Sequence, residues 1–592
     1  MKKTTFKAIS MAILCLFAIH FTAQAQELTY EIPLDTQVHA STQIVEGKVI
    51  SKKSFWDANR QNIYTVNTIE VYKVFKGDAL NTIEVITAGG TVDLDHEVVT
   101  PSLQLDVKDT GIFTLENSTI DVPVNHAAFN AYSDAQGFYK YNILNNTVIN
   151  PYHVKQNITD FYDEVVGLTN KAYDVIAEFD VNEIMNTALA NRGTMSITSI
   201  SPTTATAGTK TVLTINGSGF GATPLNVGFA NANDGGATFT GALATQILTW
   251  SDTQITVEIP SRAGNGGIAI INDTFTAVLA TSAQALSIEY AHINAVSDAI
   301  TPDVDIAYIV QHVNDNTAGG YTWQMFTDFD ADADANASFI RALDTWRCET
   351  GVNWTIGAVT TTDVVASDGI NIVRMDNGAE LPSGVLGRCT SRFSGCFISG
   401  GTDLQWYVSE LDIAFDDGTN WEFGPGAPGG TEFDFESVAV HELGHGHQLA
   451  HVIDSSVIMH YAIGPGTSNR TLSMGDIDGA GNMQTRSTTT TACTQTSMTN
   501  FDCAILSVSS EELSAAISIY PNPTKGRMFI NNDSFIEIDS AQIYDVNGRL
   551  VKDIKLNNAQ MHVINLNNVS KGVYFITINS GSTSFTEKII IE

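Results

Sequence analysis

The pattern of hydrophobic and polar positions changes several times along the chain. Between residues 27 and about 160, short stretches such as residues 43–50 and 64–74 alternate or run apolar, which predicts a small β-barrel or sandwich. From residue 158 to residue 190 the apolar side chains recur every three to four positions, which predicts one or two helices. Residues 196–290 return to short strands broken by Gly and Pro, a pattern typical of a β-sandwich.

The second half of the chain mixes both periods. Residues 336–350 place four apolar side chains on one helical face, and residues 409–415 read as a strand. Residues 487–516 are rich in Ser and Thr, which favours a linker. Near the end, Asn547-Gly548 between two apolar runs is a strong hairpin signal and predicts a small β-domain.

A chain of 592 residues is too long for one hydrophobic core, so several domains are expected. The predicted fold class is multidomain, with an N-terminal β-rich domain, an immunoglobulin-like β-sandwich, an α+β domain and a C-terminal small β-sandwich. The predicted boundaries are a signal peptide at 1–25, the N-terminal domain at 26–157, a helical segment at 158–195, the sandwich at 196–290, the α+β domain at 291–486, the linker at 487–516 and the C-terminal domain at 517–592.

The first residues predict export. Lys2, Lys3 and Lys7 precede an apolar run over residues 9–21, and Ala23-Gln24-Ala25 has the small residues of a cleavage site. No later segment is apolar for long enough to predict a transmembrane helix. The balance of 30 Lys+Arg against 65 Asp+Glu gives a net charge of −35, which argues against nucleic acid as a partner.

Five cysteines remain after the predicted signal, and export permits them to form disulfides. The closest pairs in sequence, Cys389 with Cys396 and Cys493 with Cys503, are the predicted bridges and leave Cys348 over. Pairing of Cys348 with Cys389 or Cys396 is the alternative.

Residues 441–451 hold the strongest candidate chemistry. His441 and His445 stand four residues apart, so on a helix both imidazoles project from one face toward one ion. Glu442 lies beside the first imidazole, where a carboxylate acts as a general base and not as a ligand. Zinc catalysis requires three protein ligands, an open position for water and such a base. The run therefore predicts one catalytic Zn²⁺.

The third ligand has two candidates. A Glu from a downstream helix is excluded, because no Glu occurs between Glu442 and Glu511. His451, six residues after His445, and the nearby Asp454 remain. We favour His451, because its spacing completes an extended zinc-binding signature.

With His451 included, the run resembles the metzincin signature H-E-x-x-H-x-x-G-x-x-H, except that Gln448 stands at its Gly position. Downstream, Met459 resembles the methionine turn of metzincins, which would form an apolar floor beneath the imidazoles. Tyr461 matches the tyrosine that some metzincins use as a switchable ligand and oxyanion stabiliser. The resemblance implies a zinc-dependent endopeptidase that cleaves extracellular proteins or peptides. A surface adhesin or glycan-binding protein with an inactive peptidase domain is the alternative function.

The matrixin-like branch of that family is the best match. Residues 336–350 resemble its first long helix, residues 409–415 the edge strand that binds substrate, and residues 472–479 the start of its closing helix. The family's cysteine switch cannot operate from the N-terminal region, because no Cys occurs between Gln26 and Arg347. Steric blocking of the cleft by that region is a hypothesis.

Calcium is a further candidate cofactor. Asp328, Asp330, Asp332 and Asp334 alternate just before the predicted helix, but the Gly and the bidentate Glu of a Ca²⁺ loop are absent. A solvated acidic loop that caps the helix is the prediction, with Ca²⁺ as the alternative. The Gly-rich residues 416–430 are a second, unsupported location for Ca²⁺.

Two other segments resemble known families. Gly217-Ser218-Gly219-Phe220-Gly221 and the strand around residues 251–257 resemble an IPT/TIG domain, which implies a spacer or binding module. Pro521-Asn522-Pro523 and the strand at residues 572–578 resemble the type A sorting domain of the type IX secretion system. That resemblance implies that the secretion machinery is a partner and that the protein is secreted or held at the cell surface.

Overall fold

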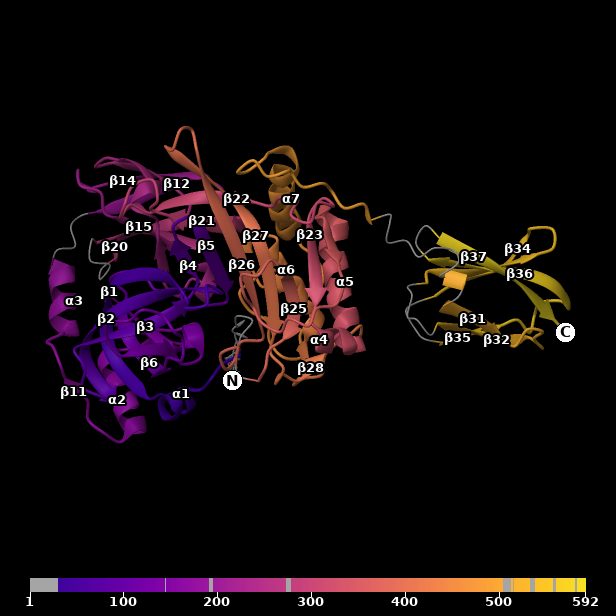
Figure 1. Cartoon of the computed structure of the whole chain (residues 1–592), viewed down its shortest axis with the longest axis horizontal. Helices are drawn as coiled ribbons and strands as arrows, with labels where there is room; N and C mark the ends of the chain where they lie inside the picture. The colour runs from indigo at the N-terminus through magenta and orange to yellow at the C-terminus, as the bar shows by residue number, and fades with distance from the viewer. Residues whose placement is uncertain are drawn as a thin grey trace, which may run out of the picture. The chain divides into compact units, whose positions relative to one another are not determined.

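The computed structural model describes residues 30–592 except 144, 191–194, 273–277, 379, 504–512, 515, 533–537, 557–560 and 581–582. The predicted signal peptide lies outside these residues. The chain divides into two compact units, Met1–Thr499 and Asn500–Glu592, and each is described by itself (Figure 1). Within the described ranges, no helix combines the length and the apolarity needed to span a membrane.

The N-terminal strands close into a barrel. Strands β1, β2, β3, β7 and β6 are hydrogen-bonded in that order, and β6 returns to pair with β1. Inward-facing Val45, Val71, Val85 and Phe113 are fully buried or nearly so, which explains why alternating strands form here. The prediction of a small barrel or sandwich is confirmed. The bounds are β1 (Gln43–Trp56), β2 (Ile63–Lys76), β3 (Thr82–Ala88), β6 (Thr110–Asn117) and β7 (Ala128–Ala131).

Helices and short strands extend the barrel. Phe161 and Val165 of α2 are buried against the barrel, as their helical spacing requires. Two helices therefore occur where one or two were predicted. The elements are α1 (Leu34–Ala40), η1 (Asp134–Gly137), β8 (Phe138–Asn142), β9 (Thr147–Ile149), β10 (Val154–Gln156), α2 (Ile158–Thr169), β11 (Asp174–Val175) and α3 (Val181–Ala190).

The next segment is a sandwich of two sheets. One has the order β12-β14-β18-β17 and the other β13-β20-β19-β15-β16. Leu213, Ile255 and Phe229 are fully buried between them, which is the alternation that the sequence predicted. The elements are β12 (Ser196–Ser201), β13 (Thr204–Ala207), β14 (Val212–Ser218), β15 (Asn226–Ala230), η2 (Ala232–Asp234), β16 (Phe239–Gly241), η3 (Ala244–Gln246), β17 (Ile247–Trp250), β18 (Gln254–Glu258), β19 (Gly266–Ile271) and β20 (Val278–His292).

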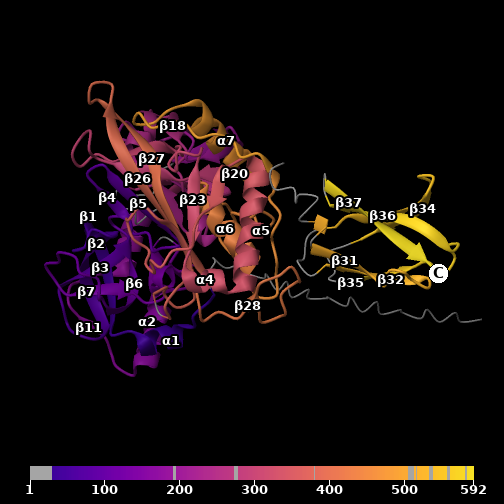
Figure 2. The same ribbon diagram turned by 45° about the vertical axis from the view of Figure 1, so that its right-hand side comes forward.

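The third segment is built on a mixed sheet with the order β24-β23-β25-β27-β26-β5-β4, and helices α5 and α6 lie beside it (Figure 2). The four predicted apolar residues of α5 are buried, and Trp346 Nε1 donates to Val440 O of α6 at 2.7 Å. The elements are β21 (Asn294–Ser297), β22 (Ile306–Gln311), β23 (Tyr321–Met325), α4 (Thr327–Ala331), α5 (Ala333–Thr350), β24 (Trp354–Ile356), β25 (Asn371–Met375), β26 (Gly387–Ile398), β27 (Asp403–Phe415), β28 (Trp421–Glu422), β29 (Phe433–Asp434), α6 (Phe435–Gly446) and β30 (Leu449–Ala450).

The edge of this sheet corrects one prediction. Residues 409–415 belong to β27, which is an interior strand because β25 and β26 pair with its two sides. The strand outside it, β26, is covered in turn by β5 (Asp95–Thr100), and β4 (Gly90–Val92) pairs with β5. The N-terminal segment therefore completes the sheet, as the purple strands beside β26 in Figure 1 show.

The predicted disulfide pairing is wrong. Cys396, near the end of β26, bonds to Cys493, which follows α7 (Met474–Thr489). Cys348 and Cys503 are also disulfide-bonded, and the free, buried cysteine is Cys389. Sequence proximity misled the prediction, because β26 and β27 extend so far that the end of β26 lies beside the segment after α7.

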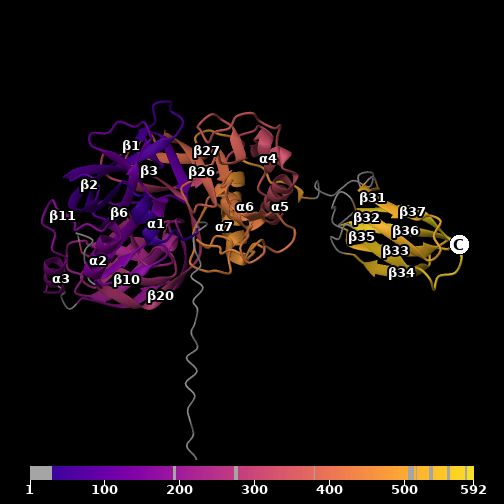
Figure 3. The same cartoon turned by 90° about the horizontal axis from the view of Figure 1, so that it is seen from below.

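The C-terminal unit is a small β-sandwich, with one sheet ordered β31-β32-β35 and the other β34-β33-β36-β37 (Figure 3). The predicted hairpin at Asn547-Gly548 joins β33 to β34, and Gly548 has the positive φ of +75° that this turn needs. The strands are β31 (Ile517–Tyr520), β32 (Arg527–Asn532), β33 (Ser540–Asp545), β34 (Leu550–Lys555), β35 (Met561–Asn565), β36 (Gly572–Ser580) and β37 (Thr583–Ile591).

Candidate metal centre

Helix α6 carries the first two candidate ligands. It begins after Asp434, whose side chain accepts a hydrogen bond from Ser437 N at 2.8 Å and caps the helix. Arg470 pairs with the Asp434 carboxylate and holds it in that position. Every residue of α6 is buried, so tertiary packing and not an amphipathic face stabilises this helix.

The turn at the end of α6 accommodates Gln448 at the position where the signature has Gly. The helix ends at Gly446, and Gln448 adopts φ +67°, the left-handed conformation for which the signature uses Gly. A residue with a Cβ pays about 1 kcal/mol there. The buried side chain of Gln448 offsets that cost, because its Nε2 donates to Gly446 O at 3.1 Å and to Ser391 Oγ at 3.3 Å.

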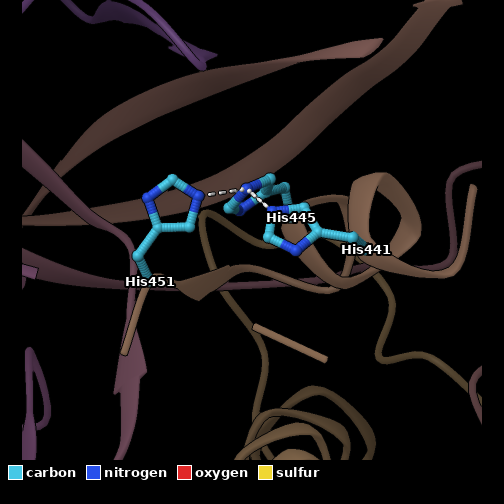
Figure 4. A group of neighbouring side chains, drawn as sticks. All are labelled: His441, His445 and His451. Carbon is cyan, nitrogen blue, oxygen red and sulfur yellow. Dashed lines mark hydrogen bonds between the residues drawn. The ribbon is translucent and has the colours of Figure 1, made fainter. Parts of the chain in front are cut away.

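The imidazoles of His441 and His445, from α6, meet that of His451, which follows the turn (Figure 4). The Nε2 atoms of His441 and His445 lie 2.9 Å apart, and those of His445 and His451 lie 3.1 Å apart. All three rings are at most 4% exposed. On their other sides, His441 Nδ1 bonds to Ile458 O at 2.7 Å, and His445 Nδ1 bonds to Leu449 O at 2.8 Å. His451 Nδ1 bonds to Asn233 Oδ1 at 3.0 Å.

These hydrogen bonds determine where each ring carries its proton. The oxygens that face Nδ1 can only accept, so each Nδ1 is protonated and each Nε2 presents a lone pair. Burial lowers the pKa of His445 to about 4 and lowers the pKa values of His441 and His451 well below the usual one, so all three rings are neutral. Lone pairs at these separations repel one another unless a cation lies between them. The residues present therefore fit Zn²⁺.

Glu442 lies beside this cluster and is fully buried. Burial raises the pKa of Glu442 well above its usual value, and the charge of nearby Arg388 opposes that rise. Within the described part of the chain, neither oxygen of its carboxylate makes a hydrogen bond of normal geometry, although the backbone amide of Cys389 faces it and also opposes the rise of its pKa. Strand β26 passes close to it, since a Cβ added to Gly387 would lie 3.1 Å from Glu442 Cγ. The carboxylate is thus held ready for a proton.

The segment after His451 forms the floor of the site. Met459 is buried beneath α6, and a Cβ added to Gly444 would lie 2.2 Å from its sulfur. The amides of Ile458 and Met459 donate to the Asp476 carboxylate of α7 at 3.0 and 3.2 Å. Asp476 therefore fixes the predicted methionine turn to the closing helix, a role that sequence reasoning missed.

Tyr461, the predicted oxyanion stabiliser, lies against the neighbouring sandwich. A Cβ added to Gly235 would be 2.3 Å from the Tyr461 hydroxyl oxygen. The tyrosine is therefore in contact with the residues that follow η2, next to Asn233. Its catalytic role remains a prediction.

Several other candidates lie away from the cluster. Asp454, the alternative third ligand, is exposed and accepts from Ser456, whereas His451 joins His441 and His445. His460 turns its Nδ1 toward Val452 O. His447, which lies between the candidate ligands in the sequence, is fully buried, and its Nε2 contacts Thr350 Oγ1 at 3.1 Å.

The acidic residues predicted to form a loop before α5 are partly helical, because Asp328 and Asp330 lie in α4 and Asp334 lies in the first turn of α5. Asp332 accepts hydrogen bonds from Asp334 N and Ala335 N, both at 3.1 Å, and thereby caps α5. Among the described residues, carboxylates of Asp376, Asp416 and Asp417 also lie close together, but Asp376 already accepts from backbone amides and Asp417 is exposed. Neither group supports a calcium site.

Comparisons with known proteins bear on three segments. Residues 195–290 match the model of the IPT/TIG domain, residues 404–484 that of Matrixin, and residues 518–592 that of the Secretion system C-terminal sorting domain. A stretch of 93 residues, 16% of this chain, is 31% identical to Ulvan lyase NLR42 of Nonlabens ulvanivorans and spans only 17% of that protein.

Solved structures add little. A protein with an immunoglobulin-like β-sandwich fold from Bacteroides vulgatus is 18% identical over 13% of this chain and 85% of its own, with a TM-score of 0.12. A structure described as being with xylogluco-oligosaccharide is 11% identical over 67% of this chain and 60% of its own, with a TM-score of 0.17. TM-scores this low do not establish a shared fold.

The candidate site thus lies within the Matrixin match. The terminal match, to a sorting domain of a secretion system, indicates a secreted or cell-surface protein and covers the segment that resembles a type IX sorting domain. In the order expected from its sequence, the chain carries an IPT/TIG domain, a matrixin domain of the metallopeptidase kind and a C-terminal secretion sorting domain.

Proposed function

We propose that this protein is a zinc-dependent endopeptidase that hydrolyses extracellular proteins or peptides. The observation that carries the proposal is the convergence of the Nε2 atoms of three imidazoles beside the buried carboxyl of Glu442. His441, His445 and His451 would hold the metal. When bound, zinc would polarise a peptide carbonyl and acidify a water molecule.

The protein's own groups would perform the remaining steps. Glu442 takes a proton from the attacking water and passes it to the leaving amine, a role suited to a carboxyl whose pKa is raised by burial. Tyr461 supports the negative charge that develops on the carbonyl oxygen. The three Nδ1 hydrogen bonds keep the imidazoles oriented, so that little reorganisation accompanies the reaction.

The test measures metal content and proteolysis on the same sample. The mature chain is expected to bind one zinc per molecule and to cleave casein, and a chelator should stop the cleavage. Glu442→Gln should retain zinc but lose at least about 100-fold in rate, because the general base is removed. Glu349→Gln, at an exposed carboxyl near the end of α5, is the control. Cleavage by Glu442→Gln at the wild-type rate would sink the proposal and favour the adhesin alternative.

A further inference from the structure

The three candidate ligands differ in what orients them. His441 and His445 donate to backbone carbonyls of the same matrixin segment, at Ile458 and Leu449. His451 instead donates to a side chain, that of Asn233, which lies 218 residues earlier in the sandwich domain. A backbone acceptor cannot be removed by substitution, whereas this one can.

Asn233 lies in a turn that side-chain hydrogen bonds stabilise. It lies in η2, and Asn231 caps this turn by accepting a hydrogen bond from Asn233 N at 3.2 Å. Asp234 accepts from Asn231 Nδ2 at 3.1 Å and from Thr238 N at 3.2 Å. Ala232 is fully buried at the base of the turn. The Asn233 amide therefore projects from a rigid support.

The sandwich also contacts the chain on both sides of His451. Before it, Leu449 and Ala450 of β30 pair with His292 and Ala291 of β20. After it, Ile453 O accepts from Asn265 Nδ2 at 2.9 Å. The Ile453 side chain packs so closely that a Cβ on Gly264 would lie 2.5 Å from its Cδ1. The third imidazole is thus presented by the contact between two domains.

We propose that Asn233 is a positioning residue for the metal centre, which makes the IPT/TIG domain part of the catalytic unit and more than a spacer. An acceptor on Nδ1 holds the imidazole in the tautomer that leaves Nε2 free to bind metal, and it fixes the plane of the ring. Because Nε2 of His451 faces the other two candidate ligands, its proton lies on Nδ1, and the amide oxygen of Asn233 accepts it. This inference rests on the proposed function.

The test uses the full chain with Asn233→Ala, Asn233→Asp and, as a matched control, Asn216→Ala. Asn216 makes similar side-chain hydrogen bonds in the same domain, with Ser199 and Gln254. Zinc affinity is measured by competition with a chelator, and the geometry of the site by the visible spectrum after substitution with Co²⁺. Loss of an acceptor behind a ligating His typically costs 10–100-fold in affinity.

Asn233→Ala should therefore bind zinc about 10–100-fold more weakly and alter the Co²⁺ spectrum. Asn233→Asp, which keeps an oxygen acceptor, should retain the zinc affinity and the Co²⁺ spectrum of the wild type. The metal-free variants should melt together with the metal-free wild type, which separates positioning from general stability. Wild-type zinc affinity in Asn233→Ala overturns the inference and leaves the proposed function intact. Failure of the wild type to bind zinc overturns both.

Different contacts carry a second inference, at the sheet edge beside the site. Strand β5 pairs antiparallel with β26 from Thr100 opposite Cys389 to Asp95 opposite Ser394. β26 is the strand that passes Glu442. The N-terminal segment therefore covers the only side of β26 that β27 leaves open in the described sheet.

Charged groups reinforce this contact. Arg392 of β26 pairs with Glu97 of β5 at 3.3 Å and also with Glu410 and Asp412 of β27, and all four side chains are at most 5% exposed. Arg388, near Glu442, donates to Pro101 O of the N-terminal segment at 3.1 Å. The docked barrel thus reaches to the margin of the candidate site.

We infer that β5 occupies the edge on which the proposed peptidase would bind an extended polypeptide, so that the N-terminal barrel keeps the enzyme latent. A free strand edge binds peptides by adding them as a further strand, and β5 already fills that position. The near-complete burial of His441, Glu442 and His451 agrees with a closed site. This inference also rests on the proposed function.

A reversible lock tests it in the full chain. Asp95→Cys with Ser394→Cys places a pair of cysteines opposite each other across the two strands. The oxidised lock should keep cleavage of a short fluorogenic peptide at background. Glu97→Lys, which sets a cation against Arg392, should raise that cleavage at least several-fold, and Glu116→Lys on the exposed part of the barrel should not. Cleavage above background by the oxidised, locked chain, or no rise with Glu97→Lys, overturns the inference. Zinc binding, measured in parallel, reports on the proposed function.

Discussion

The matrixin segment has two neighbours, and they contact it in different ways. The sandwich domain contacts the metal centre itself, through Asn233, Gly235 and the β20–β30 pairing. The barrel contacts the margin, through the β5–β26 ladder and the buried charges around Arg392. The first contact supports the ligands, and the second covers the route to them. A domain that helps build a site must stay in place, whereas a domain that covers it must leave.

The largest effect is expected on the barrel side. Arg392→Met leaves Glu97, Glu410 and Asp412 buried without their cation, and breaking such a pair from one side costs about 3–5 kcal/mol. We expect a much lower midpoint of urea denaturation at pH 7. Arg549→Met, in an exposed pair, should change it hardly at all. An unchanged midpoint for Arg392→Met would mean that the charges do not hold the barrel.

Next in size is a pH effect on the same contact. Burial raises the pKa of Glu97 to about 7, and the charged groups that face it are Arg392, Asp412 and Asp57. Because the docked carboxyl keeps its proton to higher pH than an undocked one, docking is strongest in acid. It weakens as the pH rises from about 4.5 to 7 and changes little above that, by up to about 3 kcal/mol in all.

Peptide cleavage by the intact chain should therefore increase over that pH interval more than the chemistry alone requires. Glu97→Gln removes the titrating group and should flatten the excess. The ratio of the cleavage rate of the wild type to that of Glu97→Gln, taken at each pH, measures the contribution of Glu97 to docking. A constant ratio from pH 5 to pH 8 would show that Glu97 does not control docking.

A smaller effect is expected on the sandwich side. Gly235 has φ +66°, and a Cβ there would overlap the Tyr461 hydroxyl. Gly235→Ala should displace the tyrosine and lower kcat by up to about 100-fold, while zinc affinity stays near that of the wild type. Gly221→Ala is the control, because Gly221 has φ +76° and nothing within 4 Å of the added Cβ. Equal losses of kcat in both variants would show that backbone strain, and not displacement of Tyr461, causes the effect.

The smallest effect is expected between the two neighbours, at Gln448. Its carbonyl accepts from Ile293 N, just after the sandwich, and its side chain reaches Ser391 of β26. Gln448→Gly relieves the strain at φ +67° but loses both side-chain hydrogen bonds, so stability should change by less than about 1 kcal/mol. Gln448→Ala keeps the strain and should melt at a lower temperature than Gln448→Gly. The reverse order would show that the backbone at position 448 is not strained by a Cβ.

The sequence predicted what local spacing determines. His441, His445 and His451 lie within eleven residues, and the helix and turn that bring them together follow from their own sequence. The barrel, the sandwich and the C-terminal hairpin were equally visible as alternation and turn signals. These features depend on residues that are neighbours in the chain.

What the sequence did not reveal depends on pairing between distant segments. Asn233 stands in an Asn-rich turn with no motif of its own, and its partner lies 218 residues away. The register of β5 on β26 joins residues almost 300 positions apart, and the Cys396–Cys493 bridge spans 97. Periodicity in the sequence does not specify such contacts, and they become visible only in the three-dimensional structure.

The hydrogen bond between Asn233 and His451 also bears on folding cooperativity. Metal binding contributes its free energy only to the state in which all ligands are correctly oriented. Since one orienting group belongs to the sandwich, that free energy is shared between two domains that could otherwise unfold separately. Metal would therefore merge their unfolding into a single transition, and its removal would let each domain lose structure on its own.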